Sequence, residues 1–145
     1  MKKAFTFLSI SCFLVLSSAT KIIAQATTKE ITDNFFLLFQ KTPDKAIEYA
    51  FSTNKWMEQK PEVVTQVKTQ LKGLTDMLGD CYGYDLISDN SITENLREIK
   101  YLIRYDREPL RFTFLLYKPK DKWEVLNFSF NENMDKEIEE AEKTK

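Results

Sequence analysis

Histidine is absent from the 145 residues of this chain, and cysteine, glycine and proline are scarce. Without histidine, Ser-His-Asp and Cys-His catalytic systems and every histidine-containing metal site are excluded. Of the two cysteines, Cys12 lies in a terminal apolar run and only Cys81 lies in the segment expected to fold, so we predict no intramolecular disulfide. Low glycine and proline together with many aromatic residues predict a folded domain and argue against disorder.

Residues 1–26 have the features of a cleavable export signal. Two lysines open the chain, and the apolar run from Ala4 to Ala19 is shorter than the ~20 residues that span a bilayer. Ala24-Gln25-Ala26 fits the small-x-small cleavage rule, so Thr27 is the expected first residue of the mature protein; cleavage after Ala24 or Ala19 is the alternative. We therefore expect an exported protein, periplasmic or secreted, that leaves the membrane after cleavage.

A lipid anchor is not expected, because Cys12 lies in the middle of the apolar run and does not close it. Removal of residues 1–26 leaves 119 residues, a length typical of one domain. The signal holds three lysines and no acid, so 18 basic and 22 acidic residues remain, with a net charge of −4. No basic block stands out, and we therefore predict no nucleic-acid partner.

The first half of residues 27–145 has the spacing of amphipathic helices. One helix is predicted around a stripe of Ile31, Phe35, Leu38 and Phe39. The segment Thr42-Pro43-Asp44 supplies a cap, a first-turn proline and an acid for a second helix, which carries Ala46, Ile47, Ala50 and Phe51. A third helix is predicted from Pro61, with apolar residues at 63, 67, 71, 74 and 78, and Gly79 ends it.

The second half has a period of two, which predicts antiparallel strands. A first strand, Cys81–Ser88, is expected to end in a turn at residues 89–91. A second strand from about Leu96 to Tyr105 and a third from Leu110 to Lys118 flank a turn at residues 106–109. Pairing across that turn predicts the following opposite residues on one face: Tyr105 and Leu110, Ile103 and Phe112, Tyr101 and Phe114, Ile99 and Leu116.

The last strand is expected over residues 123–130. A four-residue loop before it would turn Leu126, Phe128 and Phe130 away from Phe112 and Phe114, so we predict an odd-length loop or a bulge near residues 119–122. The expected core contains Val67, Leu71, Phe112, Phe114 and Phe128.

The outer sheet face is predicted to collect five apolar side chains, Leu102, Leu115, Tyr117, Trp123 and Val125. Such a face is apolar for a solvated surface, so we expect a homodimer through it. The alternative is that the short helix predicted in the charged tail after about residue 131, with apolar residues at 134, 138 and 141, folds back and covers this face within one chain.

The predicted fold class is α+β, with N-terminal helices packed on a curved antiparallel sheet of about four strands. The segments TNKW (53–56), LGDCYGYDLI (78–87) and YDREPLRFTFLLYKPKDKWEVLNFSFN (105–131) resemble small exported bacterial proteins of the nuclear transport factor-like, or cystatin-like, superfamily. The resemblance implies a cone-shaped domain, often dimeric, with a pocket at its open end. That superfamily includes ketosteroid isomerases, dehydratases, epoxide hydrolases and non-enzymatic binding domains, so fold does not fix function.

No catalytic motif of those enzymes matches this chain residue by residue, which leaves a carboxylate in a pocket as the one open catalytic route. Asp85 lies between Tyr84 and Leu86, and burial among aromatic residues would raise the pKa of its carboxyl enough for it to act as a base. Its alternation with apolar neighbours also fits a solvent-facing strand residue. Tyr82, Tyr84, Tyr101 and Tyr105 are the hydroxyl-bearing candidates for lining a pocket, or else they serve in packing.

We predict no metal and no cofactor. Residues 131, 133, 135, 137, 139 and 142 have the spacing of a calcium loop, but Lys136 occupies the position where that loop needs glycine. Cys81 follows a helix end and an acid, both unfavourable to a thiolate, so it is expected to be buried or inert.

Together these features predict an exported, non-enzymatic binding or interaction domain whose partner is an unknown small molecule or protein. The alternative is a pocket enzyme of the isomerase or dehydratase type that uses a carboxylate and tyrosine hydroxyls on a small apolar substrate. An acid converging on a deep pocket would favour the enzyme. An interior filled by phenylalanine, with an exposed apolar sheet face, would favour the binding domain.

Overall fold

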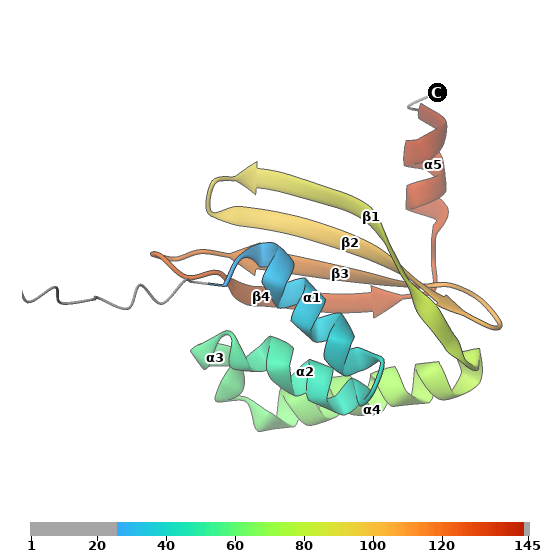
Figure 1. The fold of residues 1–145 in the computed structure, drawn as a ribbon, viewed down its shortest axis with the longest axis horizontal. Helices are drawn as coiled ribbons and strands as arrows, with labels where there is room; N and C mark the ends of the chain where they lie inside the picture. The colour runs from blue at the N-terminus through green and yellow to red at the C-terminus, as the bar shows by residue number, and fades with distance from the viewer. Residues whose placement is uncertain (1–25, 144–145) are drawn as a thin grey trace, which may run out of the picture.

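A computed structural model describes residues 26–143, and the predicted export signal lies outside the described residues except for Ala26. The elements follow the chain as α1 (Thr28–Phe39), α2 (Pro43–Ser52), α3 (Lys55–Glu58), α4 (Pro61–Leu78), β1 (Cys81–Thr93), β2 (Leu96–Tyr105), β3 (Leu110–Tyr117), β4 (Glu124–Asn131) and α5 (Asp135–Lys143). The strands form one antiparallel sheet in the order β1-β2-β3-β4. The predicted α+β fold class, with helices before the sheet, is confirmed (Figure 1).

The helix ends follow from local chemistry. Thr27 and Glu30 form a capping box at the start of α1, in which Thr27 Oγ1 accepts from the Glu30 amide at 3.2 Å and Glu30 accepts from the Thr27 amide. Pro43 and Pro61 occupy the first turns of α2 and α4, where the missing amide costs no hydrogen bond. Gly79, with φ of 83°, ends α4; a Cβ there would also lie within 3 Å of Asp106.

Helix α1 lies across one face of the sheet, which we call the concave face, with α2 and α4 farther from the strands (Figure 1). Its Phe35 and Phe36 are fully buried and meet Phe112 and Phe114 with ring centroids 5.0–6.1 Å apart. Of the predicted core, Leu71, Phe112, Phe114 and Phe128 are buried together, whereas Val67 is only partly buried against them. The concave side is therefore filled by aromatic side chains.

Strand β1 is longer than predicted, and the turn expected at residues 89–91 is wrong. Those residues stay paired with β2, and the chain reverses at Glu94 and Asn95. Asp89 forms an ion pair with Arg97 of the neighbouring strand, with Arg97 Nη2 2.9 Å from the carboxylate. Pairing with a ten-residue β2 overrides the local turn tendency of residues 89–91, and three bulges in β1 absorb the irregularity.

The predicted register between β2 and β3 is wrong by two residues. Ile103 pairs with Leu110, Tyr101 with Phe112 and Ile99 with Phe114. The connection is longer than a four-residue turn because Tyr105 pairs with Cys81 of β1, while the amides of Asp106 and Arg107 bond to the carbonyls of Asp80 and Leu78. A shift by two keeps every side chain on its predicted face, so the core composition is unaffected.

Of the two alternatives predicted before β4, an odd-length loop or a bulge, the structure has a bulge, but it lies inside the strand at Leu126 and not at residues 119–122. Phe128 pairs with Phe114 and Phe130 with Phe112, as burial requires. The bulge also exchanges the predicted facing of Val125 and Leu126. Val125 faces the core and is 3% exposed, whereas Leu126 turns outward and is 42% exposed. The prediction that Val125 belongs to the outer face and Leu126 to the core is therefore wrong.

Candidate functional site

The aromatic packing of the concave face ends beside the first turns of α1, where a cavity of about 500 Å³ opens between α1, β1 and β2. We call it the tyrosine cleft. Its apolar surface comes from Tyr84, Leu86, Ile99 and Tyr101, and its charged rim from Lys29, Asp33, Asp89 and Arg97.

Two tyrosines form the wall of the tyrosine cleft, and the core fixes both. Tyr84 is stacked on Phe36 with ring centroids 3.9 Å apart and an interplanar angle of 15°, and Tyr101 meets it edge to face at 5.8 Å. The Tyr101 hydroxyl lies 2.9 Å from Thr32 Oγ1 on α1. Burial raises the pKa of Tyr101 above its ordinary value near ~10, so the group is a neutral hydroxyl at physiological pH.

The rim of the cleft carries two cations and two anions, joined in pairs. Lys29 Nζ lies 2.5 Å from Asp33 on α1, and this hydrogen bond raises the pKa of Lys29. Across the cleft, Arg97 of β2 donates hydrogen bonds from Nε and Nη2 to the Asp89 carboxylate of β1, and these bonds raise the pKa of Arg97. Each carboxylate at the rim therefore already accepts hydrogen bonds from a cation of the same chain, and the four charges balance.

The structure brings together two of the five predicted pocket residues, Tyr84 and Tyr101. Tyr82 is exposed and donates to Asp106; this bond raises the pKa of Tyr82. Tyr105 pairs with Cys81 at the far end of β2, and burial raises its pKa. Asp85 lies on the opposite, convex face, where Arg104 Nε is 3.2 Å from its carboxylate, so it does not line the cleft.

Sequence reasoning missed the four charged residues of the rim. Asp89 falls in the predicted turn, and Arg97 is one of several charged residues in the predicted second strand. The Lys29 and Asp33 pair has the i, i+4 spacing of any exposed helix pair, which does not single it out. Only the pairing of β1 through Asp89 places that carboxylate beside Arg97 and Ile99.

The five residues predicted for a dimer face divide between two sides of the sheet. Leu102, Leu115 and Tyr117 lie on the convex face, whereas Val125 is buried in the core and Trp123 packs against its edge. Lys118 Nζ lies 5.2 Å from the centre of the Trp123 ring. Helix α5 touches the same convex face through Glu137, whose carboxylate lies 2.6 Å from Arg111 Nη1.

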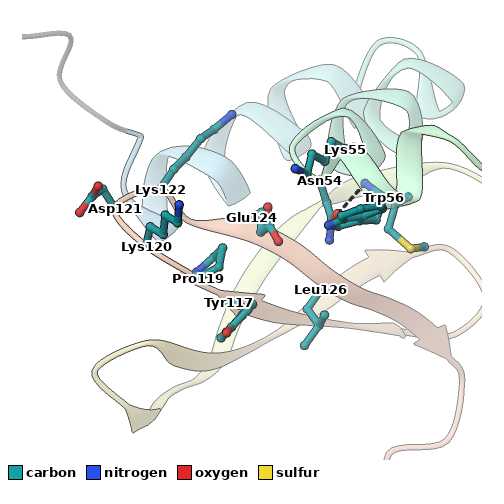
Figure 2. A pocket seen from close by; sticks show the side chains of 11 residues that line it. Asn54, Lys55, Trp56, Tyr117, Pro119, Lys120, Asp121, Lys122, Glu124 and Leu126 are labelled. Atoms are coloured by element: carbon teal, nitrogen blue, oxygen red, sulfur yellow. Dashed lines mark hydrogen bonds between the residues drawn. The ribbon is translucent and has the colours of Figure 1, made fainter.

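A second concavity, larger than the tyrosine cleft, lies between α3 and the start of β4 (Figure 2). Its volume is about 680 Å³, and we call it the tryptophan groove. Trp56, Met57, Tyr117, Pro119 and Leu126 give it an apolar surface, and Lys55, Lys120 and Lys122 line it together with Asp121 and Glu124. Trp56 is 63% exposed, a high value for tryptophan. Sequence reasoning gave this residue no role beyond the TNKW segment.

Cys81 is exposed, so of the two expectations, a buried or an inert thiol, the first is wrong. Between residues 26 and 143, no three acids or cysteines are placed to hold a metal ion, and residues 135–143 form helix α5 in place of a calcium loop. No helix in this described range is long and apolar enough to span a membrane. Comparison of the chain with protein-family models, with curated proteins and with solved structures found no match.

Proposed function

We propose that this protein is an exported, non-enzymatic binding domain that holds a small ligand in the tyrosine cleft. The observation that carries the proposal is that two kinds of surface adjoin in that cleft: an aromatic wall fixed by the core and a rim of two complete ion pairs. A surface of this kind offers stacking and polar contacts without any rearrangement of the fold. Export and membership of the cystatin-like superfamily remain predictions from the sequence.

The cleft also suggests a class of ligand. The Tyr84 ring is supported on one side by Phe36, so a flat apolar body fits against the cleft side of the wall. Both signs of charge lie around this wall, contributed by Lys29 and Asp33 from α1 and by Asp89 and Arg97 from the strands. We infer a ligand that combines an aromatic or other flat apolar body with one positive and one negative group.

The enzyme alternative gains less support from the geometry. It depends on a carboxylate held among aromatic residues, and Asp85 instead lies on the convex face beside Arg104. Phenylalanine fills the concave interior. The two acids that line the tyrosine cleft, Asp33 and Asp89, are not buried, with side chains 47% and 33% exposed, and each is bonded to a cation of the same chain. Neither is the desolvated, unpaired carboxylate that an isomerase or dehydratase would use as its base.

Titration followed by amide NMR tests the proposal. Three matched probes, phenylalanine, benzoate and benzylamine, carry the same ring with both charges, the negative charge or the positive charge. We expect phenylalanine to bind most tightly, with shifts concentrated at residues 84–89 and 97–101. Tyr84→Leu and Arg97→Gln should each weaken binding, and Asp85→Asn on the convex face is the control. Absence of shifts in the cleft at millimolar probe, or conversion of a probe to a product, would count against the proposal.

A further inference from the structure

The tryptophan groove and helix α5 lie at opposite ends of strand β4, and among residues 26–143 no hydrogen bond or ion pair joins them. The groove is bordered by Glu124 and Leu126 at the beginning of the strand, and α5 follows its end at Asn131. Eight strand residues span roughly 26 Å, and α5 is bonded at the far end, where Glu137 meets Arg111, the residue that pairs with Asn131. In this structure α5 therefore lies away from the groove of its own chain.

The groove is rigid because α3 is fixed to the free edge of β4. Asn54, which is buried, donates to the Val125 carbonyl at 3.1 Å and accepts from the Trp56 amide at 3.0 Å. Thr53 Oγ1 accepts from the Val125 amide at 2.9 Å. These bonds hold Trp56 facing the groove across from Leu126, the residue that the bulge turns outward (Figure 2). A fixed, exposed tryptophan beside an apolar groove is typical of the centre of a protein interface.

Helix α5, unlike the groove, has few contacts with the rest of the domain. It is nine residues long, its exposed surface includes Ile138 at 57% exposure, and its acids include Asp135, Glu139 and Glu142. Within residues 26–143, the hydrogen bonds and ion pairs that join α5 to another element run only between Glu137 and Arg111. Figure 1 shows the helix standing apart from the rest of the domain. A helix this short is marginal in water by itself, so packing against a second surface would stabilise α5.

The charges of the two surfaces are complementary. Lys55, Lys120 and Lys122 outnumber Asp121 and Glu124 along the groove, while α5 is predominantly acidic. We propose that α5 of a second copy of this chain lies in the tryptophan groove, with Ile138 against Trp56 and Leu126 and its acids toward Lys120 and Lys122. The exchange is reciprocal: in a two-fold dimer each copy supplies one helix and one groove, and the assembly closes.

Sedimentation velocity over a range of concentrations tests this dimer on the protein expressed from its full sequence and purified as the cell processes it. We expect a dimer at tens of micromolar. Trp56→Ala and Ile138→Glu should each raise the dimer dissociation constant at least about tenfold. Both side chains are exposed, so the variants should fold, which circular dichroism checks. Met77→Ala removes an equally exposed apolar side chain on α4, outside both surfaces, and should leave the constant unchanged.

Charge-exchange variants add a second experiment, which distinguishes this interface from any other dimer interface. Lys120→Glu combined with Lys122→Glu should weaken association, and adding Glu139→Lys with Glu142→Lys in the same chain should restore it, because both contacts of the dimer then carry exchanged charges. A protein that stays monomeric at hundreds of micromolar overturns the proposal. So does a dimer that is insensitive to both Trp56→Ala and Ile138→Glu.

Discussion

The two faces of the four-stranded sheet are built from different chemistry. On the concave face, Ile99, Ile103, Phe112 and Phe114 are almost completely buried under α1. The convex face instead carries ion pairs, among them Asp85 with Arg104, Lys100 with Glu98 and Arg111 with Glu137. The hydrophobic burial that stabilises the fold is therefore concentrated on the concave side. The tyrosine cleft lies at the boundary, where aromatic packing meets paired charges.

The largest expected effect comes from removing an aromatic ring on the concave face. Phe114 meets both Phe35 and Phe128 at 5.0 Å between ring centroids and is fully buried. Phe114→Ala should lower the free energy of unfolding by about 3–5 kcal/mol, because it removes buried surface and leaves a cavity. Urea denaturation followed by circular dichroism measures the change. A loss below about 1 kcal/mol would mean that the concave side does not hold the fold together.

A matched pair of variants at the β4 bulge compares the two faces directly. Val125→Ala removes two buried methyl groups and should cost about 1.5–2.5 kcal/mol. Leu126→Ala, at the next residue but on the outside, should change the free energy of unfolding by less than about 0.5 kcal/mol. Reversal of this order in urea denaturation would place the bulge elsewhere and restore the originally predicted facing of the two residues.

The connection between β2 and β3 should make stability depend on acid. Hydrogen bonds from the Tyr82 hydroxyl and the Asp80 amide lower the pKa of Asp106. The folded-state pKa of Asp106 lies below the unfolded value of about 3.9. The ionised carboxylate therefore contributes its full share to the free energy of unfolding above pH ~3.9, and this share is lost as the pH falls through the folded-state pKa. The urea midpoint of Asp106→Asn should therefore vary less between about pH 5 and pH 2 than that of the unmodified protein. Identical pH profiles of the two proteins would mean that Asp106 contributes nothing to the pH dependence of stability.

The smallest effect is expected on the convex face. Asp85→Asn breaks an ion pair with Arg104 in which both side chains are more than half exposed, so solvent screens the interaction. We expect the free energy of unfolding to change by less than about 0.5 kcal/mol, measured by urea denaturation. Asp85→Ala is the companion variant, and a cost above about 1.5 kcal/mol in either would show that this face contributes to stability as the concave face does.

Local signals predicted the parts of the fold that local chemistry determines. Pro43, Pro61 and Gly79 mark helix ends where the structure has them, and the alternation of Phe112 and Phe114 predicts the concave face correctly. Burial also predicted that an odd-length loop or a bulge is needed to place Phe128 beside Phe114, although its position was predicted wrongly. In each of these cases a few neighbouring residues contain the information.

Features determined by pairing between distant segments could not be predicted in the same way. The register of β2 with β3 depends on how Tyr105 and Asp106 bond to the segment around Asp80, which no local pattern encodes. The tyrosine cleft shows the same limit. Tyr84 and Tyr101 were predicted by residue type, whereas Asp89 and Arg97 acquire a role only once β1 continues past the expected turn.

Native mass spectrometry of the protein purified from its producing cells tests the central claim, that the tyrosine cleft is a ligand site, most directly. We expect a small non-protein mass on the unmodified protein and on Asp85→Asn, and its loss from the double variant Tyr84→Leu with Arg97→Gln. An unmodified protein that carries no bound molecule, or a bound molecule that persists in the double variant, would contradict it.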